Sequence, residues 1–235
     1  MTRVLRRYAR PVLTALAALA ALALPAIASA QDTGELDARM CRNGLFAAYG
    51  PFQLARISGE GRAYFLHDRD GCPEAADCRS LGQPYVVAGD TVIVSRLRMG
   101  HACAFFPNAV GGTAGYLPLE RLEFIETGAP TGDNGWFGSW SGVGSSDIAI
   151  GMSREGPRVA GTAFWQGLPT ADGHAVIHDG EINGPITFFG NRARFDEGLC
   201  IVDFTLLGDY LLASDNGRCG GMNVRFIGVY LRDPD

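Results

Sequence analysis

The stretch LCIVDFTLLGDYLLASDNGRCGGMNVRFIGVYLR (residues 199–232) contains three β-type runs separated by turn residues. The runs cover residues 199–206, 210–213 and 222–231, and they are rich in β-branched and aromatic side chains. The last run alternates in character from one residue to the next, which is typical of a strand with one buried face. The side chains that share one face of this predicted strand are Met222, Val224, Phe226 and Tyr230.

The residues between the last two runs predict a turn that is held by a disulfide. Asp215-Asn216-Gly217 suits positive φ angles and therefore a tight hairpin turn, and Gly220-Gly221 suits a bulge before the last strand. Cys219 then lies at the entrance of that strand, within reach of Cys200. The alternative is a catalytic loop with Cys219 as nucleophile, which requires an unpaired cysteine. We therefore favour the disulfide-bonded hairpin.

The first thirty residues have the pattern of a secretory signal peptide. Four arginines precede an apolar run at residues 12–24, and Ala28-Ser29-Ala30 forms a small-residue cleavage site. The apolar run is too short to cross a bilayer, and no second run is long enough. We expect cleavage between Ala30 and Gln31, a periplasmic or secreted mature chain, and no membrane span.

All six cysteines follow the expected cleavage site. An even number of cysteines in an exported chain indicates disulfides. The last two must pair with each other if bridges stay within domains, and the first four allow three connectivities. No C-x-x-C spacing occurs, so we expect neither a metal nor another cofactor. The pairs that we favour are Cys41–Cys103, Cys72–Cys78 and Cys200–Cys219.

The charge of the chain excludes some classes of partner. The sequence has 20 basic residues, all of them arginine, and 25 acidic residues. Four of the arginines lie in the signal peptide, which has no acidic residue, so the mature chain has a formal charge of −9. An acidic chain without a basic cluster argues against binding to nucleic acid or to an anionic membrane surface.

The stretch GAPTGDNG (residues 128–135) is the clearest break between patterned segments, and we interpret it as a linker. It separates a first domain at residues 31–127 from a second domain at residues 136–235. Short β-type runs recur every eight to twelve residues, about five in the first domain and about eight in the second. This spacing predicts an all-β fold with two small barrels. A short N-terminal helix is expected at residues 37–48.

Residues 84–122, PYVVAGDTVIVSRLRMGHACAFFPNAVGGTAGYLPLERL, resemble bacterial SH3-like domains. In that family a Gly-Asp turn opens a strand, and a G-[WY]-L-P segment precedes a single helical turn. The sequence departs from the pattern at His101, where an aromatic residue is usual, and in the inserted loop DRDGCPEAADC. The family often binds cell-wall peptides or short extended peptides. The resemblance implies a groove formed by Tyr64, His101, Phe106 and Tyr116, although for Phe106 and Tyr116 a core position is the simpler interpretation.

The second domain carries two weaker resemblances. WFGSW (residues 136–140) is similar to the start of lipocalin-like antiparallel barrels, which hold one small ligand or are filled by side chains. We expect a filled barrel, with Trp165 exposed at its mouth. The pattern from Leu199 to Tyr230 resembles the end of exported proteobacterial proteins, some of them labelled lysozyme inhibitors (LprI-type). The multi-cysteine N-terminal module of those inhibitors is not visible.

The sequence predicts no catalytic residues. No G-x-S-x-G elbow occurs near the serine-rich stretch at residues 142–147. His174 and His178 share one face of a predicted strand, close to Asp172 and Asp179, but two solvent-facing histidines explain this pattern better than a zinc site. The acidic pairs of the second domain have no spacing that singles them out for glycoside hydrolysis.

These patterns together favour a non-enzymatic binding protein of the cell envelope. The expected partner is a cell-wall peptide or an envelope protein, such as a lysozyme-like peptidoglycan hydrolase that the protein inhibits or regulates. One alternative is an envelope hydrolase with an SH3-like targeting domain, and another is a carrier that holds a small ligand in its barrel.

Overall fold

The computed structural model describes residues 40–69, 71–108, 111–128, 135–142, 146–170 and 172–234. The regular structure of these residues consists of β-strands and two 3₁₀ turns, η1 (Phe46–Ala48) and η2 (Leu119–Arg121). The expected all-β fold is therefore confirmed. The described part of the chain contains no helix that is long and apolar enough to span a membrane. The expected signal peptide, its cleavage site and most of the expected linker lie outside the described residues.

The expected N-terminal helix is wrong for the described part of residues 37–48. Only η1 is helical there, and it is a single 3₁₀ turn. Gly44 has a φ of +81°, which interrupts any regular helix before Leu45. The turn nevertheless buries Phe46 and Ala47, so these apolar residues serve the core without an α-helix.

The N-terminal half contains a five-stranded antiparallel sheet in the order β6-β5-β4-β1-β7. The two central strands have short runs of buried residues on both faces, which places them inside the fold. The single helical turn expected after Gly-Tyr-Leu-Pro is present as η2, between β6 and β7. The strands of this sheet are β1 (Gln53–Ile57), β4 (Thr91–Arg98), β5 (His101–Phe106), β6 (Thr113–Pro118) and β7 (Leu122–Ile125).

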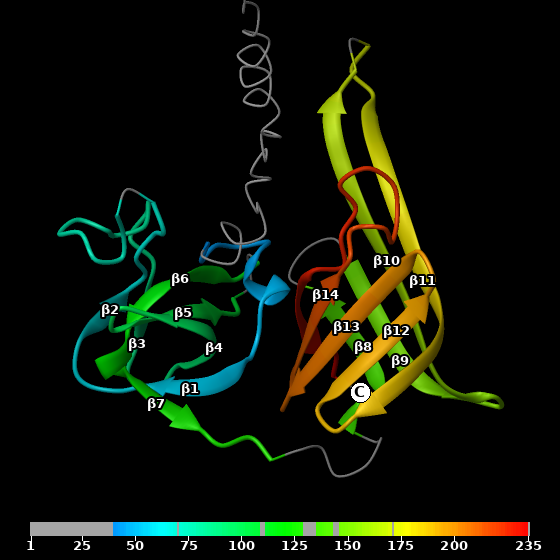
Figure 1. The fold of residues 1–235 in the computed structure, drawn as a ribbon. Coiled ribbons are helices and arrows are strands. Elements are labelled where there is room, and N and C mark those ends of the chain that lie inside the picture. Colours follow the sequence, from blue (N-terminus) through cyan, green and yellow to red (C-terminus); the bar gives the residue numbers. More distant parts are fainter. Residues whose placement is uncertain are drawn as a thin grey trace, which may run out of the picture. The chain divides into compact units, whose positions relative to one another are not determined.

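A separate two-stranded ribbon is formed by β2 (Arg62–Tyr64) and β3 (Tyr85–Val87) (Figure 1). The ribbon is joined to the five-stranded sheet through Leu66, which bridges to Arg79 on one side and to Tyr116 on the other. Sequence patterns predict β2, as part of a β-type run at residues 62–66, but they do not predict β3, whose three residues show no alternation.

The C-terminal half is an eight-stranded closed antiparallel barrel (Figure 1). Each strand pairs with the next one along the chain, and the last strand pairs with the first. This up-and-down meander is the barrel that the sequence predicts. Its strands are β8 (Gly138–Gly142), β9 (Ser146–Ser153), β10 (Gly156–Pro169), β11 (Ala175–Phe189), β12 (Arg192–Glu197), β13 (Cys200–Leu207), β14 (Tyr210–Asp215) and β15 (Gly228–Arg232).

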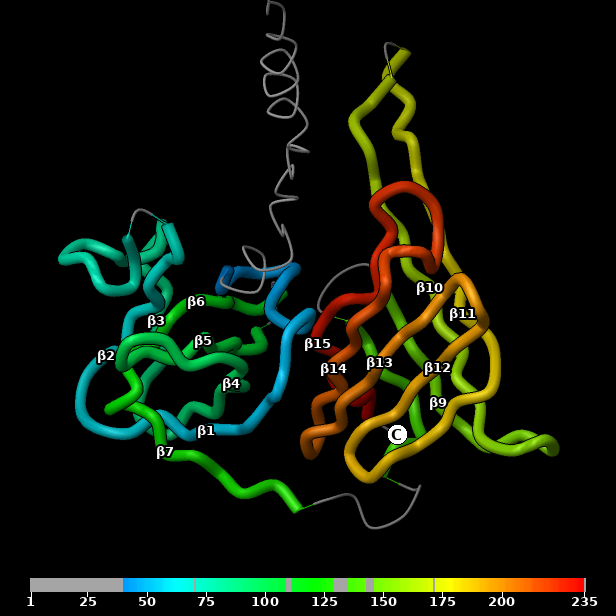
Figure 2. The backbone as a smooth tube through the Cα atoms, viewed as in Figure 1, coloured from blue at the N-terminus to red at the C-terminus, as the bar shows by residue number. Residues whose placement is uncertain are grey.

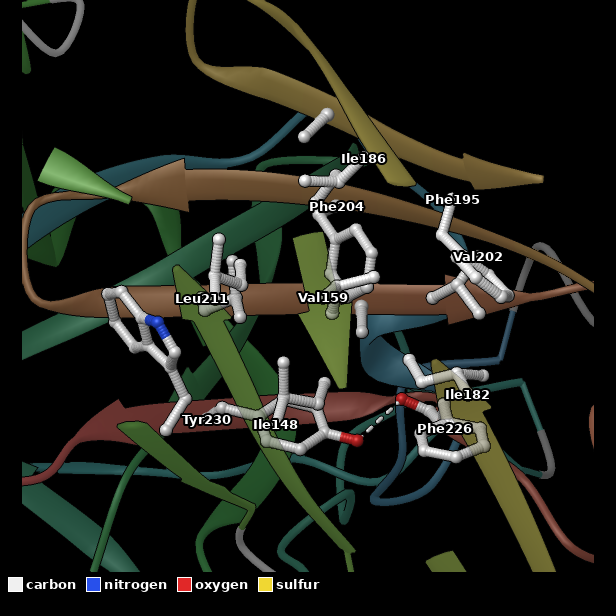
Figure 3. Close-up of a cluster of buried hydrophobic side chains, with 14 of the residues drawn as sticks. Ile148, Val159, Ile182, Ile186, Phe195, Val202, Phe204, Leu211, Phe226 and Tyr230 are labelled. Carbon is white, nitrogen blue, oxygen red and sulfur yellow. Dashed lines mark hydrogen bonds between the residues drawn. The ribbon is translucent and has the colours of Figure 1, made fainter. Parts of the chain in front are cut away.

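Large side chains fill the interior of the barrel (Figure 3). On β13, Val202, Phe204 and Leu206 alternate inward, and every other strand of the barrel adds at least one buried aliphatic or aromatic residue. Trp140 is fully buried, and its indole N–H donates to the carbonyl of Trp136. The expected filled barrel is therefore the arrangement that the described residues adopt.

The segment between β14 and β15, residues 216–227, differs from the expected hairpin and last strand. We call it the closing segment, and Figure 2 shows it as the long red loop. It turns Val224 and Phe226 into the barrel core but leaves Met222 exposed. The last strand therefore begins at Gly228 rather than at Met222. The hydroxyl of Tyr230 donates to the carbonyl of Phe226, 2.9 Å away, and fixes the end of the segment (Figure 3).

The paired glycines of the closing segment permit close contact with β11. The N–H of Gly221 donates to the carbonyl of Asp179 at 3.0 Å. A Cβ atom on Gly180 would lie 2.4 Å from the carbonyl oxygen of Cys219 and 2.9 Å from the Cα atom of Gly220. The backbone of Cys219-Gly220-Gly221 therefore packs directly against the backbone of β11 and does not form the expected bulge before a strand.

Gly180→Ala is expected to lower the free energy of unfolding by about 2 kcal/mol, because the added methyl group forces two backbone segments apart. Gly151→Ala is the matched control, since a Cβ atom there meets nothing within 4 Å. Urea unfolding of both variants measures the difference. Equal stability of the two variants would show that the close contact has no energetic weight.

Three disulfides are present, and they are the pairs expected from the sequence: Cys41–Cys103, Cys72–Cys78 and Cys200–Cys219. Cys41 and Cys103 lie in a hydrophobic cluster that also includes Phe46, Phe105 and Tyr116. Leu207, Leu212 and Val229, which point outward from the barrel, belong to the same cluster. The described residues all fall within one compact unit, Gly34–Asp235.

Candidate functional site

Tyr116, one of the four residues expected in a binding groove, does not line an open surface. Its side chain is 1% exposed and lies in the cluster around Cys103 and Phe105. The inward direction follows from the pairing of Tyr116 with Cys103 across β6 and β5. The groove interpretation is therefore wrong for Tyr116, and the core interpretation is correct.

His101 and Phe106 are separated by the length of β5. His101 pairs with Pro118 at the start of the strand, and Phe106 pairs with Thr113 at its end. Strand residues rise by about 3.3 Å each, so the two backbones are about 17 Å apart. Phe106 is half-buried against the inner cluster, and a ring nitrogen of His101 lies 3.1 Å from the carbonyl of Met99. The structure does not bring these two side chains into one groove.

Tyr64, in contrast, belongs to an ordered row of side chains on the β2–β3 ribbon. We call Arg62, Tyr64, Arg79 and Tyr85 the arginine–tyrosine row. Tyr64 pairs with Tyr85 across the ribbon, and their ring centroids are 5.9 Å apart in an edge-on arrangement. The guanidinium carbon of Arg62 lies 4.1 Å from the ring of Tyr85, and that of Arg79 lies 4.3 Å from the ring of Tyr64.

The face of the ribbon that carries this row is open to solvent. Ala63, Phe65 and Val86 point to the buried side, so their neighbours along the chain point outward. Tyr85 and both arginines are exposed, and Tyr64 is half-buried. A hydrogen bond with Tyr64 raises the pKa of Arg62, so this guanidinium is charged at every physiological pH.

A second candidate surface is the projecting end of the β10–β11 hairpin, residues 164–179, which we call the arm. Among the described residues, pairing of β10 with β9 ends at Ala163, and pairing of β11 with β12 begins only at Ile186. β10 and β11 continue to pair with each other as far as Pro169 and Ala175. Figure 1 shows this end of the hairpin extending past the other strands of the barrel.

The outer face of the arm is apolar and exposed. Val159 and Ala163 point into the barrel core, so the side chains of Phe164 and Leu168 point away from it. Phe164 is 52% exposed, Leu168 is 87% exposed, and Ile177 on the facing strand is 62% exposed. Between residues 164 and 181 the chain has three acidic residues and no arginine or lysine. The arm is therefore an apolar projection with negative charge around it.

Trp165 lies on the inner face of the arm, at its base. It pairs with His178 across the two strands, and the two ring centroids are 5.6 Å apart. The indole ring packs against the barrel core and is half-buried, so Trp165 is less open than a residue exposed at a barrel mouth. It supports the arm from the inside rather than forming its contact surface.

The tip of the arm is held by backbone hydrogen bonds. The N–H of Thr170 donates to the carbonyl of His174 at 2.8 Å, and the N–H of Gly173 donates to the carbonyl of Thr170 at 2.9 Å. The hydroxyl of Thr170 also donates to the carbonyl of His174. Gly173 has a φ of +84°, which a residue with a side chain rarely adopts. The two sides of the tip, at Thr170 and at residues 173–174, are therefore joined by hydrogen bonds.

The described residues contain no arrangement typical of a metal or thiol centre. No group of three or more His, Cys, Asp and Glu side chains among them is placed to hold a metal ion. All six cysteines are disulfide-bonded, so Cys219 is not a free thiol. The carboxylate of Asp215, close to Cys219 in sequence, accepts hydrogen bonds from backbone N–H groups of the closing segment.

Most residues of these two surfaces are not evident in the sequence. Tyr85 lies in the three-residue strand β3 and Arg79 precedes that strand, and neither segment has a readable period. Phe164 and Ile177 have the apolar character of core residues, and only the unequal lengths of the strands place them outside the barrel. The available signal was the distance in sequence between the two β-type runs at residues 158–165 and 174–182, since this hairpin is longer than a typical barrel strand pair.

No protein-family model, curated protein or solved structure matches this chain. The geometry of the arginine–tyrosine row and of the arm is therefore the basis for assigning a function.

Proposed function

We propose that the protein is an exported, non-enzymatic binding protein of the cell envelope that docks a protein partner through the arm. The observation that carries this proposal is the projecting pair of strands with Phe164, Leu168 and Ile177 exposed on one face. Burial of each such side chain in a complex contributes roughly 1.5–3 kcal/mol. An exposed apolar surface of this kind on a folded protein commonly marks an interaction site.

The charge on the arm indicates the kind of partner. Asp172 and Asp179 on the arm and Glu181 beside its base provide negative charge, and residues 164–181 contain no arginine or lysine that offsets it. A complementary partner has an apolar cleft with a basic rim, because complementary charge steers encounter and disfavours wrong partners. A basic peptidoglycan hydrolase of the lysozyme type has this chemistry, and occupation of its substrate cleft by the arm inhibits it.

The alternative functions have less support. A carrier needs an internal cavity, whereas the barrel interior is occupied by buried side chains such as Phe204, Phe226 and Tyr230. An envelope hydrolase needs a catalytic set, and the described residues bring no such set together on either surface.

A lysozyme assay tests the proposal. The mature chain is expected to slow hydrolysis of purified peptidoglycan by a basic lysozyme. Phe164→Ser and Leu168→Ser are each expected to weaken this inhibition about tenfold, since truncated anchor residues cost more than 1 kcal/mol. Met152→Ser is the control, because Met152 is 61% exposed on the barrel away from the arm. Peptidoglycan hydrolysis by the protein itself, or unchanged inhibition by both arm variants, contradicts the proposal.

A further inference from the structure

The β2–β3 ribbon carries a second surface whose chemistry differs from that of the arm. Its outer face is set by three successive cross-strand positions: Arg62 opposite Val87, Tyr64 opposite Tyr85, and Leu66 opposite Arg79. The two arginines therefore come from positions on either side of the edge-on tyrosine pair. Four strand residues separate these positions, so the backbones of the two arginines are about 13 Å apart along the ribbon.

Both guanidinium groups are oriented before any ligand arrives. Each lies over a tyrosine ring at 4.1–4.3 Å from its centroid, which is the distance of a cation–π contact. Stacking uses the flat face of the guanidinium and leaves donors at its edge, where it binds a carboxylate through two parallel hydrogen bonds. Because the rings already restrict the side chains, binding loses less conformational entropy than it would with two free arginines.

Neither arginine is neutralised within the part of the chain that the structure describes. Other arginines there form ion pairs with carboxylates, for example Arg42 with Asp68 and Arg98 with Glu74. Arg62 and Arg79 form no such pair with a described carboxylate and contact tyrosines instead. In a chain with an acidic excess, two oriented arginines on an exposed ribbon are an attractive site for an anion.

We propose that the arginine–tyrosine row binds an extended peptide that carries two carboxylates, one at each arginine, with its backbone or side chains against the rings of Tyr64 and Tyr85. The class of ligand follows from the geometry. Two guanidinium groups, each over a different ring of the tyrosine pair, fit two carboxylates on an extended chain better than one compact anion. Such a peptide comes from a cell-wall stem peptide or from an acidic segment of a protein.

The test uses the mature chain and two pairs of probes in calorimetric titrations. The first pair is acetyl-Glu-Gly-Thr-Gly-Glu-amide and its Gln-for-Glu analogue. The second pair is a soluble wall fragment with free stem-peptide carboxylates and the same fragment after amidation. Tighter binding of the first acid probe identifies a protein segment as the source, and tighter binding of the wall fragment identifies the wall. Equal binding of acid and amide forms in both pairs overturns the proposal.

Variants of the two arginines test whether the arginine–tyrosine row is the binding site. The double variant R62Q/R79Q is expected to bind the preferred acid probe at least about tenfold more weakly, and the amide analogue equally well. The double variant R154Q/R218Q removes the same two charges from exposed positions outside the ribbon and is expected to bind like the unaltered chain. R62K/R79K keeps the charge without the planar fork and is expected to fall between the two. Unchanged affinity in R62Q/R79Q, with circular dichroism showing an intact fold, overturns the proposal.

This inference and the proposed function fail separately. Binding of the acidic peptide depends on residues of the ribbon, whereas lysozyme inhibition depends on residues of the arm. Phe164→Ser is expected to leave binding of the acid probe unchanged, and R62Q/R79Q is expected to leave lysozyme inhibition unchanged.

Discussion

Replacement of Asp215 with Ala is expected to lower the free energy of unfolding by about 4 kcal/mol, since each hydrogen bond to a charged group contributes roughly 1.5–3 kcal/mol. The carboxylate is fully buried at the end of β14. One oxygen accepts from the N–H of Gly217 at 2.6 Å and from Nε of Arg225 at 2.8 Å. The other accepts from the N–H of Phe226.

The expected loss is large because Asp215 replaces the strand pairing that the closing segment lacks. Without the carboxylate, the buried N–H of Phe226 has no acceptor, and an unsatisfied buried donor costs its full desolvation energy. Phe226 itself belongs to the barrel core, so displacement of its backbone also disturbs packing. Asp215→Asn retains one acceptor oxygen but turns an amide N–H₂ group toward other donors, and an intermediate loss is expected.

Guanidinium unfolding followed by tryptophan fluorescence measures this effect. Asp203→Ala is the control, because Asp203 forms an exposed ion pair with Arg194 at 3.0 Å. Exposed pairs contribute 0–1 kcal/mol, so this variant is expected to unfold near the unaltered chain. A loss below about 1 kcal/mol in Asp215→Ala would show that water replaces the carboxylate and that the closing segment is not fixed by it.

The barrel is the part of the fold that the sequence predicts well. The alternation of Val202, Phe204 and Leu206 is readable because their neighbours Asp203 and Thr205 face outward. Gly208 separates β13 from β14 with a φ of +59°, which only a glycine adopts readily. Local alternation and turn chemistry agree here, so the meander follows from short-range pattern alone.

The closing segment shows where local pattern fails. Residues 222–227 alternate like a strand, but they pair with no neighbouring strand. The long-range bond from Phe226 to Asp215 and the contact of Gly221 with Asp179 decide their conformation. Such partners cannot be read from a period of two residues, because any extended chain with one buried face shows that period.

The sequence-based prediction is wrong at strands β11 and β12, and the two errors cancel in the number of strands. The residue pattern of the barrel half predicts two separate strands at residues 174–182 and 186–189, because Asn183-Gly184-Pro185 resembles a turn. β11 continues through Pro185 because the strand has a partner on one side only at this position. Pro185 pairs with Arg158 of β10, and pairing with β12 begins only at Ile186. β12 was missed because Arg192–Glu197 is mostly charged, with only Ala193 and Phe195 facing the core. The expected number of strands is therefore correct although two assignments are not.

The candidate surfaces were less predictable than the barrel. Tyr64 was identified through the SH3-like resemblance, but its neighbours Tyr85 and Arg79 become visible only when the ribbon is paired. The same resemblance placed Tyr116 on the surface, where cross-strand pairing with Cys103 turns it inward. An exposed functional aromatic residue and a core aromatic residue are alike in sequence, and only the register of the strands separates them.

Removal of the Cys41–Cys103 disulfide by a double substitution with Ala is expected to lower the free energy of unfolding by about 4 kcal/mol. The bond closes the longest loop of the three, with a sequence separation of 62 residues. The separations are 19 residues for Cys200–Cys219 and 6 for Cys72–Cys78, for which the chain-entropy model gives losses of about 3 and about 2 kcal/mol. The order of the three losses is therefore a sharper prediction than any single value.

Urea unfolding of the three double-Ala variants tests this order, with each variant compared under non-reducing conditions. Packing strengthens the expectation for the first bond, because Cys41 and Cys103 are buried in the cluster with Phe46 and Phe105. The Cys72–Cys78 bond, in contrast, closes a loop whose residues are mostly exposed. If removal of Cys72–Cys78 cost more than removal of Cys41–Cys103, the inserted loop would be an organising element of the N-terminal half. The stability of that half would then depend on the insertion and not on the buried disulfide between its first residues and β5.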